Sequence, residues 1–247
     1  MKANVCVLLL ILTSSACAQT EQTAPSLLPN DTSRLPQPGE TISLRDLRIP
    51  PKGVKELQRS QDALKSGDVS SSARHLGKAI QIYPDCLEAH NNLGARYIDL
   101  QEYEKAAVEF QRAIAIDPRV PQPWNNLSVA FFLQQRYRDA EAAARSALNV
   151  APEHAMARYM LGAILATERR NPEEAMDLLR QTKSEFPDAR LLLAQILLRR
   201  GALEEAEEEL RGYLALTDAP KRQNVERWLA RLTHTSATIA PALPNKP

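Results

Sequence analysis

A repeat of about 34 residues runs through the middle of this chain and limits what it can fold into. Prolines 84, 118 and 152 are evenly spaced, and Pro187 continues the series one position late. Two further landmarks recur with this spacing. The first is a Leu followed by a small residue, at Leu93-Gly94, Leu127-Ser128 and Leu161-Gly162. The second is a single alanine, at Ala106, Ala140, Ala175 and Ala206. Several landmarks in one phase indicate a solenoid, in which each repeat packs on its neighbours.

The composition predicts helices throughout. Hydrophobic residues make up 44% of the chain, charged residues 25% and aromatic residues only 5%. The repeat region is rich in Ala, Leu, Glu, Arg and Gln, the residues with the highest helix propensity. Small side chains at the landmark positions would let paired helices approach closely. We therefore expect an all-α fold.

The segment from Leu87 to Val120 resembles the tetratricopeptide-repeat family, whose repeats are two antiparallel helices. It carries the family's markers: Leu93-Gly94, Tyr97, Ala106, Phe110, Ala113 and Pro118. The resemblance covers roughly residues 53–220 and implies a right-handed α-solenoid of antiparallel helix pairs. It also implies a protein or peptide partner.

We predict five repeats and a terminal helix within a domain over 51–232. Repeat one departs from the pattern, with Arg59 and Ser60 where Leu and Gly are expected. The predicted boundaries are 53–86, 87–120, 121–154, 155–187 and 188–219, with a capping helix over 220–232. Terminal repeats of solenoids are atypical because they cover an open end.

Residues 1–18 are predicted to be a signal peptide. A basic start at Lys2 precedes a short apolar run, and Ala16-Cys17-Ala18 matches the small-x-small cleavage rule. Cys17 leaves a second interpretation open, because a lipoprotein signal also ends on a cysteine. In that interpretation Ser14 stands where Leu is usual. Under both interpretations the protein is exported. Under the first it is free in the periplasm or the medium, and under the second it is anchored to a membrane through a lipid on Cys17.

The segments that flank the repeats are predicted to be disordered. Residues 19–50 form a predicted spacer, of which 19–41 is rich in Pro, Thr and Ser and shows no apolar periodicity, so it can bury little surface. Residues 233–247 form a proline-containing tail.

Charge and motif content disfavour catalysis and nucleic-acid binding. The formal net charge is only +1, and nucleic-acid binders need a surplus of Lys and Arg. No two of the four histidines have metal-ligand spacing on one face, and Cys86 is the only cysteine of the repeat region. We find no catalytic triad or phosphate-binding loop. We therefore expect no enzyme, no metal, no cofactor and no small-molecule substrate.

The first helices of the repeats are expected to line the concave face and to bind a polypeptide there. Asn92 and Asn126 occupy the sixth position of adjacent repeats, and in the similar O-linked N-acetylglucosamine transferase solenoid such asparagines form a ladder. A primary amide offers both a donor and an acceptor to a peptide backbone. The predicted groove residues are Asn91, Asn92, Asn125, Asn126, Val129, Phe132, Met156 and Tyr159.

Two alternatives to this groove remain. Asparagine is common at these positions in the family, and the aromatic side chains could be covered by their neighbours.

The Lys and Arg clamp with which some members bind a carboxylate is missing from repeats two to four. The preferred function is a non-catalytic interaction adaptor, and the alternative is a lipid-anchored envelope assembly or pilot factor tethered through Cys17.

Overall fold

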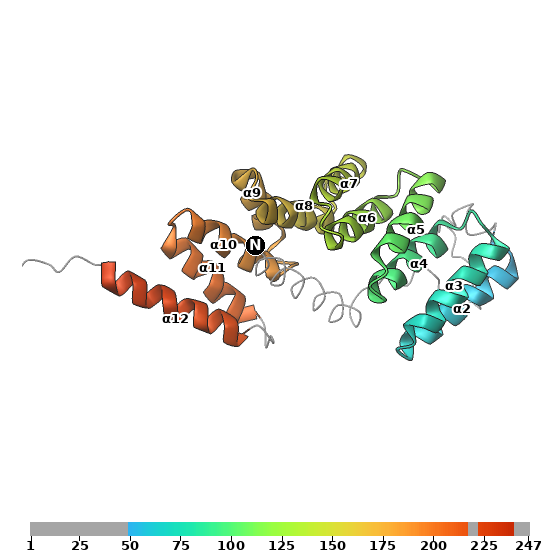
Figure 1. Cartoon of the computed structure of the whole chain (residues 1–247), viewed down its shortest axis with the longest axis horizontal. Coiled ribbons are helices and arrows are strands. Elements are labelled where there is room, and N and C mark those ends of the chain that lie inside the picture. Colours follow the sequence, from blue (N-terminus) through green and yellow to red (C-terminus); the bar gives the residue numbers. More distant parts are fainter. Residues whose placement is uncertain (1–48, 217–221, 240–247) are drawn as a thin grey trace, which may run out of the picture. The chain divides into compact units, whose positions relative to one another are not determined.

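The computed structural model describes residues 49–216 and 222–239, and these residues form helices joined by short turns, with no strand among them (Figure 1). The all-α prediction is confirmed. The predicted signal peptide, Cys17, most of the spacer and the end of the tail lie outside the described residues. The chain divides after Val150 into two compact modules, which we describe separately.

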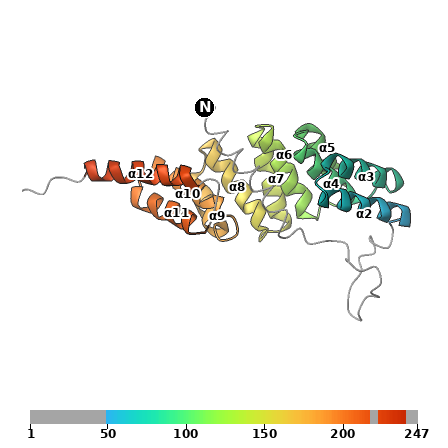
Figure 2. The ribbon, with the colours of Figure 1, turned by 90° about the horizontal axis from the view of Figure 1, so that it is seen from below.

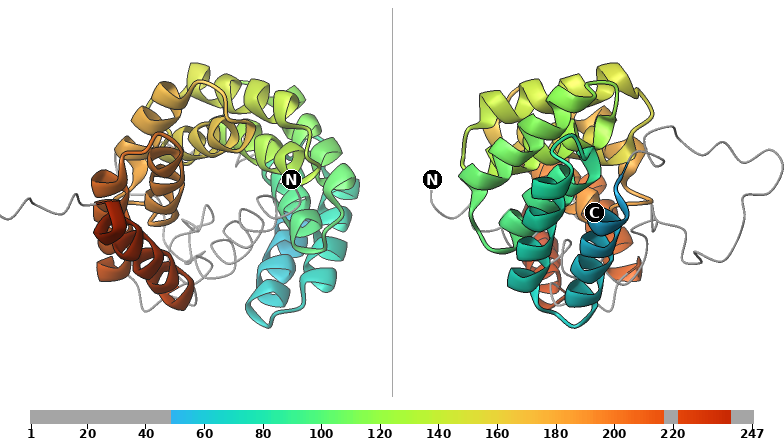
Figure 3. Two further views of the ribbon diagram at one scale, coloured as in Figure 1. Left: turned by 60° about the vertical axis from the view of Figure 1, so that its left-hand side comes forward. Right: turned by 90° about the vertical axis from the view of Figure 1, so that its right-hand side faces the viewer.

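The N-terminal module holds three helix pairs. Each pair is a hairpin of antiparallel helices, and successive pairs pack through α3 on α4 and α5 on α6. Figure 3 shows these helices running side by side. The bounds are α2 (Pro51–Lys65), α3 (Val69–Ile82), α4 (Leu87–Asp99), α5 (Tyr103–Ile116), α6 (Pro121–Leu133) and α7 (Tyr137–Val150).

The C-terminal module holds two pairs and a terminal helix. Its helices are α8 (Ala155–Glu168), α9 (Pro172–Thr182), α10 (Asp188–Arg199), α11 (Leu203–Leu216) and α12 (Arg222–Ile239). The last of these packs on α11 (Figure 2). Its Val225 is buried. It continues beyond the predicted end at residue 232, because no proline interrupts the chain before Pro241.

Small residues set the distance between paired helices, as the sequence predicts. A Cβ atom added to Gly94 of α4 would lie 2.5 Å from Cε1 of Phe110 on α5. At the equivalent place in the C-terminal module, a Cβ on Gly162 would lie 2.9 Å from Cγ of Leu179. Phe110 and Leu179 are almost fully buried, at 1% and 0% exposed. The large side chain of the second helix therefore fills the space that glycine leaves on the first.

The turn within each pair uses one residue in the left-handed region. These residues are Gly67, Gln101, Gln135, Arg169 and Gly201, with φ of 79°, 60°, 61°, 55° and 76°. Glycine adopts this conformation without strain, whereas in Gln and Arg the Cβ atom crowds the backbone. The turn of repeat four, which carries one extra residue, contains a second such position at Asn171, with φ of 43°. Asn171 precedes α9 but makes no side-chain cap, contrary to the usual role of Asn before a helix.

Candidate partner-binding site

Three asparagine amides connect α4 to α6 in the N-terminal module. Asn126 Nδ2 on α6 donates to Asn91 Oδ1 on α4 at 2.9 Å. Asn125 Nδ2 in turn donates to Asn126 Oδ1 at 3.4 Å. The asparagines therefore form one hydrogen-bonded row, which we call the amide row (Asn125, Asn126 and Asn91).

The row differs from the predicted one by one residue. The sequence pairs Asn126 with Asn92, which holds the same position of the preceding repeat, but the structure pairs it with Asn91. Asn92 is instead exposed, and its amide makes no hydrogen bond within the described part of the chain. Asn125 is only 5% exposed, and its Oδ1 atom is buried with no hydrogen-bond partner among the described residues.

The predicted apolar strip is more covered than expected. On α6, Val129 is half-buried, whereas Phe132 is only 4% exposed. The ring of Phe132 packs edge-on against Tyr137, with ring centroids 5.4 Å apart and planes at 63°. The expectation that Phe132 is open to a partner is therefore wrong, because the next helix of its own pair supplies an aromatic neighbour.

The remaining two predicted residues belong to the C-terminal module. Met156 is half-buried on α8, and Tyr159 is 4% exposed. The ring of Tyr159 stacks on Phe186, with centroids 4.9 Å apart, and burial raises the pKa of its hydroxyl, to which the nearby Asp188 and Tyr213 add. Tyr159 is thus also covered rather than open. The binding role of all eight predicted residues stays a prediction.

Comparison with known proteins identifies the family. Models of the TPR repeat match residues 94–135, and models of the tetratricopeptide repeat match residues 126–188 and 166–232. Together the matches run from residue 94 to residue 232, more than half of the chain. The chain is a tetratricopeptide-repeat protein. No significant match to a curated protein sequence was found.

Solved tetratricopeptide-repeat structures have the same fold. MamA from Desulfovibrio magneticus RS-1 (residues 41 to the end) superposes with a TM-score of 0.61 and 18% identity, covering 69% of this chain and 99% of its own. TTC0263 of Thermus thermophilus, described as a thermophilic TPR protein, superposes with a TM-score of 0.58 and 20% identity. The match covers 74% of this chain and 99% of TTC0263. Pseudomonas aeruginosa pilF superposes with a TM-score of 0.62 and 19% identity, and the match covers 78% of this chain and 93% of pilF. At these identities the likeness concerns the fold.

The fourth position of three repeats of this tetratricopeptide-repeat protein has a shared role that the sequence did not suggest. His90 Nε2 lies 2.9 Å from the carbonyl oxygen of Pro84. Trp124 Nε1 donates to the Pro118 carbonyl at 2.9 Å, and Arg158 Nε donates to that of Pro152, also at 2.9 Å. An imidazole, an indole and a guanidinium thus each bond the carbonyl of the proline that ends the preceding repeat.

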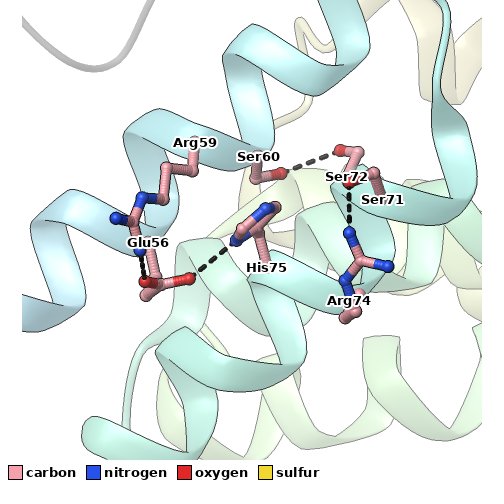
Figure 4. A network of polar contacts seen from close by, with 7 residues as sticks. All are labelled: Glu56, Arg59, Ser60, Ser71, Ser72, Arg74 and His75. Atoms are coloured by element: carbon pink, nitrogen blue, oxygen red, sulfur yellow. Dashed lines mark hydrogen bonds and ion pairs between the residues drawn. The ribbon is translucent and has the colours of Figure 1, made fainter.

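Two histidine–glutamate pairs were also missed from the sequence. Glu56 of α2 bonds His75 Nδ1 of α3 at 2.7 Å, and Arg59 also pairs with Glu56 (Figure 4). His90 Nδ1 of α4 contacts Glu109 Oε2 of α5, also at 2.7 Å. The two pairs have the same separation along the chain, so they occupy the same positions of repeats one and two with the two residue types exchanged. The equal spacing of Glu56 to His75 and of His90 to Glu109 is the sequence signal from which the two pairs could have been predicted.

Repeat one compensates for its irregular first helix with polar contacts. Ser60 takes the place of the small landmark residue, and its hydroxyl bonds that of Ser72 at 2.8 Å (Figure 4). Both serines are buried, at 4% and 1% exposed. The pairing satisfies two hydroxyls that would otherwise be costly to bury.

Groups typical of catalytic or metal sites are sparse in the described residues. No three His, Cys, Asp or Glu residues there lie close enough together to hold a metal ion. Cys86 is buried, and burial raises the pKa of its thiol to about 11. Such a thiol stays protonated near neutral pH and is a poor nucleophile. No described helix is both long and apolar enough to span a membrane.

The C-terminal module also has a surface cleft of about 420 Å³ between α9, α10 and α11. Met176 and Leu197, both buried, form part of its lining. Ion pairs occupy its rim, Arg200 with Glu173 at 2.8 Å and Arg180 with Glu205 at 3.9 Å. Because these rim charges pair with one another, they do not indicate a charged ligand.

Proposed function

We propose that this tetratricopeptide-repeat protein is a non-catalytic adaptor that binds an extended polypeptide segment along α4 and α6. Family membership supports a protein-interaction scaffold in general terms. We further propose that it acts outside the cytoplasm, in the periplasm or at the cell envelope, since its N-terminus has the pattern of an export signal.

The observation that carries the proposal is the amide row with its unused groups. Asn91 accepts from Asn126 through Oδ1, which leaves its own Nδ2 hydrogens without a described partner. The exposed amide of Asn92 stands next to it in the chain. Together these groups present donors and an acceptor, which is what an extended peptide backbone requires from a surface that does not read its sequence.

Burial makes the row well suited to this role. The buried Asn125 donates to Asn126 and restrains its orientation, so the amides are held before a partner arrives. A preorganised surface loses less side-chain entropy on binding than a mobile one. Val129, half-buried on the same helix, adds apolar contact area beside the amides.

Photo-crosslinking in native envelopes tests the proposal. A benzophenone amino acid at Gln122, an exposed position of α6, would report on partners at this face by mass spectrometry. Asn92→Ala should lower the crosslinked yield several-fold and leave the unfolding transition unchanged, because Asn92 has no described internal bond. Asn126→Ala should lower the yield and also cost about 1 kcal/mol of stability through the lost bond to Asn91.

The matched control is Gln111→Ala, an exposed residue of α5, which should change neither yield nor stability. If the double variant Asn92→Ala with Asn126→Ala gives the wild-type yield, α4 and α6 are not the binding face.

A second candidate function rests on Cys17, which lies outside the described residues. Its place after Ser15-Ala16 resembles the end of a lipoprotein signal and favours a lipid-anchored assembly factor. Metabolic labelling with palmitate decides between the two. Label that is present in wild type and lost in Cys17→Ser supports the anchor, and unlabelled wild-type protein with Gln19 as its first residue excludes it.

A further inference from the structure

The lysines of the described chain fall into two groups. Lys105 pairs with Glu102 and Lys183 pairs with Glu209, each at 2.5 Å. The other described lysines are all exposed, and none makes an ion pair or hydrogen bond with a described residue. These are Lys52, Lys55, Lys65 and Lys78. All of them belong to α2 and α3, the first helix pair.

The first helix pair also carries a surplus of positive charge. Residues 51–82 contain six basic and three acidic residues, whereas residues 83–216 contain 16 basic and 21 acidic residues. The three acidic residues have other partners: Glu56 bonds α3, Asp62 accepts from a glutamine of its own helix, and Asp68 caps α3. The lysines of this pair are therefore not neutralised within the described fold.

Lys52 and Lys78 lie at the same level of the helix pair. Glu56 Oε2 contacts His75 Nδ1 at 2.7 Å, which fixes two facing points on α2 and α3 (Figure 4). Lys52 lies one turn before Glu56, and Lys78 lies about one turn after His75. Because the helices are antiparallel, both steps lead toward the same end of the pair, and residues three or four apart share a helix face. The two lysines therefore flank the same side of the pair.

That side is the open end of the repeat array in the described chain. Glu56 holds the fourth position of repeat one, which His90 and Trp124 hold in the next two repeats. Those two side chains bond the proline carbonyl of the repeat before, so the fourth position faces the preceding repeat. No helix pair precedes the first one among the described residues. We call this surface the basic end face (Lys52, Lys55, Arg59 and Lys78).

We propose that the basic end face binds the anionic surface of a phospholipid bilayer. The groups it recognises are the lipid phosphates, and the N-terminal module contacts the membrane through its first repeat. This site is separate from the amide row on α4 and α6 and does not depend on the function proposed for it. Polybasic surfaces are attracted to anionic lipid without a precise fit, which matches a face that has cations but no pocket.

The residue types favour lipid over a protein partner. Three of the four cations are lysines, whose hydrated point charge suits a diffuse layer of phosphates, whereas paired recognition of carboxylates favours the fork of arginine. Neither α2 nor α3 contains Phe, Tyr or Trp, although Tyr and Trp dominate the hot spots of protein interfaces. The first repeat is also the part of the described fold nearest in the chain to Cys17. A lipid on that cysteine would bring this face to the membrane first.

Two other occupants fit the charge less well. A second copy docked end to end would bring α12, the last helix, against the lysines, and α12 exposes Arg222 and Arg227. Residues 19–48 of the chain itself contain four acidic and three basic residues, so they offer little net charge to the face. An anionic lipid surface is the occupant with complementary charge.

Co-sedimentation with vesicles tests the proposal. Every sample is the full chain with Cys17→Ser, so that no lipid attached to the protein contributes. The chain should bind vesicles of phosphatidylcholine with about 30% phosphatidylglycerol at about 50 mM NaCl, and affinity should fall about tenfold or more at about 300 mM, because salt screens exposed charges. Equal binding to pure phosphatidylcholine vesicles, or no binding to the anionic ones, overturns the proposal.

A pair of charge-matched variants locates the site. Lys52→Gln with Lys78→Gln should weaken binding about tenfold or more and leave the unfolding transition unchanged, because neither lysine has a described partner. Arg138→Gln with Arg169→Gln removes the same charge from exposed residues of other repeats that also have no described partner, and should bind like the parent chain. Equal losses in the two double variants overturn the assignment to the end face.

A competitor separates lipid from an acidic polypeptide. A short polyglutamate peptide should not displace the chain from the anionic vesicles, because three of the four cations lack the fork that grips single carboxylates. Displacement shows that the face prefers carboxylates and overturns the lipid assignment. Asn92→Ala with Asn126→Ala should bind these vesicles like the parent chain, so vesicle binding and crosslinking at Gln122 can fail independently.

Discussion

Replacing Gly94 with alanine adds one methyl group at the closest approach of α4 and α5. The new Cβ would lie 2.5, 2.7 and 2.9 Å from Cε1, Cδ1 and Cζ of Phe110. These distances are shorter than van der Waals contact, and Phe110 is only 1% exposed, so the ring has no free space to move into. The helices must separate or the ring must leave its rotamer.

The size of the effect can be worked out from two opposing terms. Overpacking of a well-filled core costs about 1–3 kcal/mol. Alanine in place of a glycine inside a helix stabilises the folded state by about 0.5–1 kcal/mol, because alanine has the higher helix propensity. Mid-range values of the two terms lower the free energy of unfolding of Gly94→Ala by about 1 kcal/mol, and the extremes allow a loss of up to about 2.5 kcal/mol.

The chain provides a matched control in the same module. Gly77 lies inside α3, and a Cβ added to it meets no atom within 4 Å. Gly77→Ala should gain the propensity term alone and raise the free energy of unfolding by about 0.5–1 kcal/mol. The same chemical change is thus expected to have opposite signs at two helical glycines.

Urea unfolding followed by far-ultraviolet circular dichroism measures both changes, since both act on the transition of the N-terminal module. Pairing Gly94→Ala with Phe110→Leu should give a smaller loss than the sum of the two single losses, because the smaller side chain relieves the clash. A midpoint for Gly94→Ala at or above that of Gly77→Ala would refute the steric reasoning.

Three further predictions concern other positions. Trp124→Phe keeps an aromatic ring but removes the N–H that bonds the Pro118 carbonyl, so urea unfolding should show a loss of about 1 kcal/mol. Gln101→Gly relieves the left-handed backbone of its turn, where φ is 60°, and should not destabilise the protein, whereas Gln101→Val should cost about 1 kcal/mol or more in the same assay. Because the pKa of the Cys86 thiol is raised to about 11, its alkylation by iodoacetamide, followed by peptide mass spectrometry, should be negligible at pH 8 and rise as the pH approaches 11; rapid labelling at pH 8 would contradict the burial.

The regular features of the fold could be predicted because they recur. The spacing of Pro84, Pro118 and Pro152 marks the ends of three second helices, and the structure has turns at these places. Gly94 and Gly162 were predicted to permit close approach, and the structure places Phe110 and Leu179 against them. A position with the same steric role in each repeat carries the same type of residue each time, so it can be recognised from the sequence.

The candidate site was only partly predictable, because lateral contacts between repeats do not follow position numbers. The sequence pairs Asn126 with Asn92, but the bond goes to Asn91. Contacts within one repeat also escaped the helical count: Phe132 and Tyr159 hold positions that point away from their own pair's interface, yet Tyr137 and Phe186 of the same repeats cover them.

The sequence alone therefore determined the helix-pair repeat and the small residues at its interfaces, since these depend on spacing along one chain direction. Only the tertiary structure decided which amides meet, which aromatic rings are covered and that His90 has an acceptor at each nitrogen. Those features depend on how far one helix is displaced along its neighbour. A displacement of about 1.5 Å, the rise of a single helical residue, is enough to exchange one partner for the next.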